Sequence, residues 1–103
     1  NKAKFADTAV EQLLRIMTSM NAQIKYITAK IAGGAQMFSF RDKTNDLLNI
    51  GERNVRATIE ALKQHNIPII AQDTGGNYGR TIELHAETGL LVVRTIGHGT
   101  KTL

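Results

Sequence analysis

The clearest pattern near the start of the chain is an apolar residue at every third or fourth position. Between residues 6 and 20, these positions are Ala6, Ala9, Val10, Leu13, Leu14, Met17 and Met20. This spacing places apolar side chains along one face of an α-helix. We therefore predict a helix over residues 6–20, with its methionines in the core.

A second helix is predicted over residues 50–65. Asn49 and Glu52 have the three-residue spacing of a capping box, which satisfies free backbone N–H groups at a helix start. The apolar positions that follow are Val55, Ile59 and Leu62. Pro68 disfavours helical geometry at the residue before it, so we expect this helix to end near residue 65.

Four segments have the composition or the alternation of β-strands. Residues 24–31 are rich in β-branched and aromatic side chains and lead into two glycines. Residues 67–71 form a short apolar run, which indicates a buried strand. Residues 80–86 alternate apolar and polar side chains, and a turn separates them from the apolar segment 90–96. These last two segments predict a β-hairpin.

The order of these elements predicts an α/β fold. Strand 24–31, helix 50–65 and strand 67–71 would form a βαβ crossover, which makes the two strands parallel. The hairpin would extend them antiparallel into one mixed sheet, with the helices packed on the sheet. At this length the chain is expected to be a single domain, residues 1–103, and the polar segment 39–48 a loop.

Composition narrows the classes of function. The 13 Lys and Arg residues outnumber the 9 Asp and Glu residues, which gives a net charge of +4. No two of these basic residues are adjacent, and only 5% of all residues are aromatic. Nucleic-acid binding, which uses basic stripes with stacking aromatics, is therefore not expected. No apolar run approaches the ~20 residues of a membrane-spanning helix, so no membrane insertion is expected. The chain has no cysteine, which fits a reducing cytoplasm and excludes a thiolate nucleophile within these residues.

The triplet Asp73-Thr74-Gly75 follows an apolar strand, as the catalytic triplet of an aspartic protease does. Retroviral-type proteases of this length are almost wholly β-structure, however, and too little chain follows Asp73 to build the rest of that fold. The glycines favour a structural turn, with an anion-binding nest of backbone N–H groups beside Arg80 as the alternative. We expect Asp73 to accept hydrogen bonds from the turn backbone or from Arg80.

The histidines do not predict a metal site. His65, His85 and His98 are far apart in the sequence and form no His-x-x-x-His pair. We expect neither a metal nor a cofactor.

Three motifs occur in an order and spacing that resemble the CheD family, the chemoreceptor glutamine deamidases of bacterial and archaeal chemotaxis. They are AKIAGGAQMF at residues 29–38, NIGERNV at residues 49–55, and QDTGG at residues 72–76 followed by Arg80. The resemblance extends over nearly the whole chain but covers only the C-terminal two-thirds of a family member. Because the chain also begins at Asn1 and not at Met, we expect a trimmed or fragmentary chain.

The resemblance implies a cytoplasmic enzyme that hydrolyses specific receptor glutamine side chains to glutamate and releases ammonia. In the family, a cysteine thiolate paired with a histidine attacks the carboxamide, and both residues lie upstream of the matched part. The implied partners are the cytoplasmic helices of methyl-accepting chemoreceptors and the phosphatase CheC. No catalytic residue is expected in this chain, which alone is predicted to be inactive. The alternative is an inert CheD-like module that binds CheC or receptor helices.

The resemblance also marks supporting residues. Those expected to shape the fold are Gly33, Gly34, Asn54, Asp73, Thr74, Gly75, Gly76 and Arg80. Met37 and Phe38 are expected to contact partners, because apolar residues beside a polar loop are common at interfaces.

Overall fold

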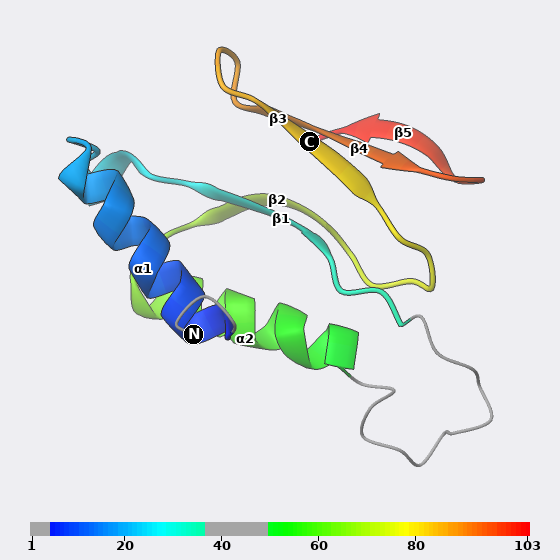
Figure 1. Ribbon diagram of the computed structural model, residues 1–103, viewed down its shortest axis with the longest axis horizontal. Helices are drawn as coiled ribbons and strands as arrows, with labels where there is room; N and C mark the ends of the chain where they lie inside the picture. Colours follow the sequence, from blue (N-terminus) through cyan, green and yellow to red (C-terminus); the bar gives the residue numbers. More distant parts are fainter. Residues whose placement is uncertain (1–4, 37–49) are drawn as a thin grey trace.

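The computed structural model describes residues 5–36 and 50–103 (Figure 1). Its helices are α1 (Ala6–Ser19) and α2 (Ile50–Gln64), with a 3-10 turn at Ile24–Tyr26. Its strands are β1 (Ala29–Gly33), β2 (Ile69–Thr74), β3 (Thr81–His85), β4 (Leu90–Thr95) and β5 (Gly99–Thr102). The α/β class is confirmed. The segment 39–48 and the capping residue Asn49 lie outside the described residues.

Both helices end in the same way. Asn21 and Asn66 take left-handed backbone conformations, with φ of 76° and 61°. Asparagine tolerates this conformation better than most residues, and it lets the chain turn back over the last helical turn. The N–H of Ala22 then donates to the carbonyl of Met17, and that of Ile67 to Leu62. These bonds satisfy carbonyls that would otherwise have no partner within the helix.

The first sheet pairs β1 with β2 in parallel, as the predicted crossover requires. The register shifts between Ala29, which lies opposite Ile69, and Lys30, which lies opposite Ala71. Ile70 is therefore an extra residue in β2, as in a β-bulge. Ile70 is 58% exposed, so the prediction of a fully buried strand is wrong at this position.

The second sheet is antiparallel in the order β3, β4, β5. The hairpin β3–β4 was predicted and is confirmed. It does not pair with β1 or β2, however, and it gains a third strand, β5, that the sequence pattern did not indicate. Gly97 and Gly99, with φ of 82° and 80°, allow the chain to reverse tightly between β4 and β5.

Three layers result. Figure 1 shows α1 and α2 on one side of the β1–β2 sheet and the β3–β5 sheet on the other. The buried centre of the helix side consists of Leu14, Leu62 and Ile67. On the other side, Leu91 and Val93 of β4 are buried, whereas every residue of β3 is exposed.

Two further predictions need correction. Residues 24–26 form a 3-10 turn, so the strand predicted from residue 24 starts only at Ala29. Met20, predicted to lie in the core, is 74% exposed because it follows the end of α1.

Candidate functional site

A compact ion cluster lies where β2 ends. The carboxylate of Asp73 accepts a hydrogen bond of 3.0 Å from Arg80 Nε and one of 3.3 Å from Lys101 Nζ. The Arg80 side chain is 3% exposed and that of Asp73 is 11% exposed. The expected pairing of Asp73 with Arg80 is confirmed. Lys101 was not predicted, because it comes from β5, far along the chain.

The pKa of Asp73 reflects opposing influences. Burial raises it, but the hydrogen bonds and positive charges of Arg80 and Lys101 lower it more, so the pKa lies below its ordinary value. The carboxylate is therefore charged near neutral pH. A group held in this state suits a structural ion pair better than proton transfer, which agrees with the rejection of a protease-type role.

Two glycine pairs join the ends of β1 and β2. Gly33, Gly34, Gly75 and Gly76 all have positive φ, which glycine adopts without strain. The N–H of Gly75 donates to the carbonyl of Gly33 at 2.9 Å. Arg80 Nη1 donates to the same carbonyl at 3.3 Å. The glycine pairs and the ion cluster therefore form one connected unit, in the turn predicted from the sequence.

Gly34 also permits a close approach to the first turn of α2. A Cβ atom added to Gly34 would lie 2.2 Å from Cγ2 of Val55. A Cβ added to Gly51 would lie 2.4 Å from the carbonyl oxygen of Gly34. Neither position has room for a side chain, so the NIGERNV motif contributes its glycine to this contact.

The remaining predicted residues lie around the same unit. Asn54 and Thr74 line a hollow of 110 Å³ together with Gly34. Gly33, Gly34 and Arg80 line a second hollow of 300 Å³, which also includes Tyr78. The structure thus brings all eight predicted supporting residues to one end of the β1–β2 sheet. Met37 and Phe38 lie outside the described residues.

A row of stacked side chains borders this unit. The rings of Tyr78 and His98 are stacked with centroids 4.0 Å apart, and the Arg80 guanidinium lies 4.7 Å from the centre of the Tyr78 ring. Cation–π attraction of this kind helps to fix a guanidinium in place. The stack was not predicted, since His98 stands between two glycines and is far from Tyr78 in the sequence.

Lys30 provides a second polar link, near the opposite end of the sheets. Its Nζ donates to the carbonyls of Gly89 and Leu103, each at 2.7 Å. It therefore connects β1 to the β3–β4 turn and to the end of the chain. This link has no counterpart in the sequence-based predictions, because Lys30 stands in a strand with no local signal for its partners.

The described residues include no group of three or more His, Cys, Asp or Glu side chains that could hold a metal ion. No described helix is long and apolar enough to cross a membrane. The chain has no cysteine. The interactions at this site link elements of the fold: the Gly75–Gly33 hydrogen bond joins β2 to β1, and the Lys101–Asp73 hydrogen bond joins the two sheets.

Comparison with known proteins gives a consistent result. The family model described as CheD, chemotactic sensory transduction, matches residues 1–95. A protein of Caldanaerobacter subterraneus subsp. tengcongensis named "Probable chemoreceptor glutamine deamidase CheD" is 58% identical over 101 residues, which cover 98% of this chain and 62% of that protein. The "Chemoreceptor glutamine deamidase CheD" of Bacillus subtilis is 47% identical over 103 residues, which cover 100% of this chain and 61% of that protein. The chain thus spans less than two-thirds of the length of these relatives.

Proposed function

The chain belongs to the CheD family, and on this premise we propose that it is the C-terminal portion of a chemoreceptor glutamine deamidase. The observation that carries the proposal is the match over residues 1–95 together with relatives of that name. We also propose that residues 1–103 all belong to one domain, of which they form the C-terminal portion. The chemistry is hydrolysis of glutamine side chains in methyl-accepting chemoreceptors.

The reaction would need a cysteine and a histidine from outside this chain. The cysteine thiolate attacks the carboxamide carbon, and ammonia leaves after the histidine has protonated the nitrogen. Water then hydrolyses the thioester, which gives glutamate and restores the thiol. In this scheme, the Asp73 cluster (Asp73, Arg80 and Lys101) and the glycine pairs act as a rigid support for the catalytic segment.

The proposed partners are the cytoplasmic helices of chemoreceptors and the phosphatase CheC, in the cytoplasm. Met37 and Phe38 are proposed to contact one of them. A pull-down with CheC or a receptor fragment should weaken in Phe38→Ala. Unchanged binding would exclude Phe38 as a contact.

A second candidate is an inert CheD-like module that binds the same partners without chemistry. Such a module would bind a receptor fragment or CheC without converting glutamine to glutamate, and this outcome distinguishes it from the deamidase.

The deciding experiment measures conversion of glutamine to glutamate in a chemoreceptor cytoplasmic fragment by peptide mass spectrometry. The full-length Caldanaerobacter relative serves as the positive control. We expect no conversion by the 103-residue chain alone and conversion when it is co-expressed with the part of that relative that it does not match. Conversion by the chain alone would refute the proposal that the catalytic residues lie outside this chain. An assembled pair that binds receptor without converting it would favour the inert module.

A further inference from the structure

The outer edge of β2 has no strand beside it among the described residues. The sheet to which β2 belongs has two strands there, β1 and β2. An unpaired edge presents backbone N–H and C=O groups that can bond to another strand.

A groove runs between this edge and α2. It consists of two neighbouring hollows of 460 and 490 Å³ that share Ile59 and Ile69. We call it the β2 groove, and its lining residues include Ile59, Lys63, Ile67, Ile69, Ala71 and Gln72. The groove is mainly apolar, apart from the Lys63, Asn66 and Gln72 side chains.

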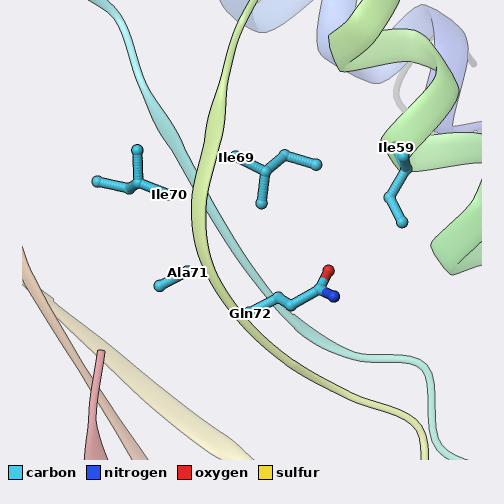
Figure 2. Close-up of a pocket in the computed structure, with 5 residues that line it drawn as sticks. All are labelled: Ile59, Ile69, Ile70, Ala71 and Gln72. Atoms are coloured by element: carbon cyan, nitrogen blue, oxygen red, sulfur yellow. The ribbon is translucent and has the colours of Figure 1, made fainter.

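The bulge in β2 exposes apolar surface on the other face of the strand as well. Figure 2 shows Ile69 and Gln72 pointing toward Ile59 of α2, and Ile70 and Ala71 pointing the opposite way. Ile70 is 58% exposed. A strand placed along β2 would therefore meet apolar side chains on both of its faces.

We propose that the free edge of β2 is completed by a β-strand from the part of the family's length that this chain does not match, and that this strand is apolar on both faces. The relatives exceed the matched region by more than a third of their length, which is enough to supply such a strand. Strands buried on both faces are near-continuous apolar runs, unlike strands with one solvated face. The proposal rests on the proposed function, because that function identifies this chain as one portion of a longer protein that would supply the strand.

The edge of β2 is favoured over that of β1 because of the surface beside it. Both hollows of the β2 groove are lined by α2, β2 and the segment between them, and by no residue of β1. The extra residue Ile70 also places an exposed apolar side chain at this edge.

The test is amide hydrogen exchange of the 103-residue chain, alone and co-purified with the unmatched part of the Caldanaerobacter relative. The N–H groups of Ile69–Thr74 that do not bond to β1 should exchange at least about tenfold more slowly in the complex. A complex that protects β3 or α1 and leaves these amides unchanged would overturn the proposal. Absence of a complex would overturn it too. Protection in the chain alone, together with a dimeric mass, would mean that a second copy occupies the edge.

A pair of matched variants locates the contact. Ile70→Lys should weaken association with the unmatched segment by roughly tenfold or more, because a charge replaces an apolar side chain at the edge. Ile96→Lys is the control, since Ile96 is 99% exposed and lies outside the β2 groove. Equal effects of the two variants would contradict the proposal.

These experiments distinguish failure of the strand proposal from failure of the proposed function. If the assembled pair deamidates receptor but the β2 amides are not protected, the proposed function stands and the strand proposal is wrong. If the β2 amides are protected but the assembled pair has no deamidase activity, the strand proposal stands and the inert module is favoured.

Discussion

The two faces of the β1–β2 sheet are held by different interactions. Toward the helices, Leu14, Leu62 and Ile67 form a buried apolar cluster. Toward the β3–β5 sheet, Lys30 and Asp73 of the first sheet reach across to backbone carbonyls and to cationic side chains. Apolar burial suffices where two helices cover the strands. On the other face, Leu91 and Val93 of β4 are buried and polar links lie at the two ends, while β3 is exposed along its whole length.

The largest expected difference in stability is between a substitution in the buried cluster and a matched one in β3. Leu62→Ala should lower the free energy of unfolding by roughly 3–4 kcal/mol, because it opens a cavity in a packed site. Leu84→Ala removes the same atoms from β3, where Leu84 is 67% exposed, and should cost less than about 1 kcal/mol. Urea denaturation of both variants measures the difference. Equal losses would contradict the unequal burial of the two regions.

The next largest loss of stability is expected from a substitution in the Asp73 cluster. Asp73→Asn should cost roughly 3 kcal/mol, because it leaves the Arg80 guanidinium, 3% exposed, without its counter-charge. Glu11→Gln makes the same change in the exposed Glu11–Arg15 pair of α1 and should cost at most about 0.5 kcal/mol. Thermal unfolding at pH 7 compares the two. If Asp73→Asn were as mild as Glu11→Gln, the cluster would not hold the sheets together.

A smaller loss is expected at the second polar link. Lys30→Met should cost about 1.5 kcal/mol, because two carbonyls lose a charged donor while the aliphatic part of the side chain is kept. Lys63→Met, on an exposed position of α2, should change stability by no more than about 0.5 kcal/mol. Denaturation of both variants in the same buffer provides the comparison, and a larger loss in Lys63→Met would rule out the link.

The smallest effect is confined to acidic pH. Since the folded pKa of Asp73 lies below its ordinary value, the charged form contributes stability above the ordinary value of about 3.9, and this contribution is lost as the pH falls through the folded pKa. Stability measured from pH 6 downward should therefore fall more steeply in the parent chain than in Asp73→Asn. Parallel curves would show that Asp73 does not have a lowered pKa.

The helix side of the molecule was largely predictable from sequence. The three- and four-residue spacing of apolar residues located α1 and α2, and Asn21 and Asn66 stand where the helices end. The Asp73–Arg80 pair could be predicted because both residues belong to one turn. Local patterns carry this information, since the residues that interact are near neighbours in the chain.

The side of the molecule formed by the β3–β5 sheet could not be predicted in the same way, because its contacts join residues that are far apart in the sequence. Lys101 and Lys30 find their partners on a different sheet, and no spacing rule indicates such a pair. The strand β5 was missed because the glycines around His98 resemble a tail, although they form the turn into that strand. The start of β1 was placed too early because the 3-10 turn also contains a β-branched residue, Ile24, and an aromatic one, Tyr26.

The most direct test of this account is amide hydrogen exchange across the 103-residue chain alone. The account predicts slow exchange in α1, α2 and the β1 ladder, and fast exchange in β3 and along the free edge of β2. Uniform protection of both sheets at low protein concentration would contradict it, because the second face would then be as well covered as the first.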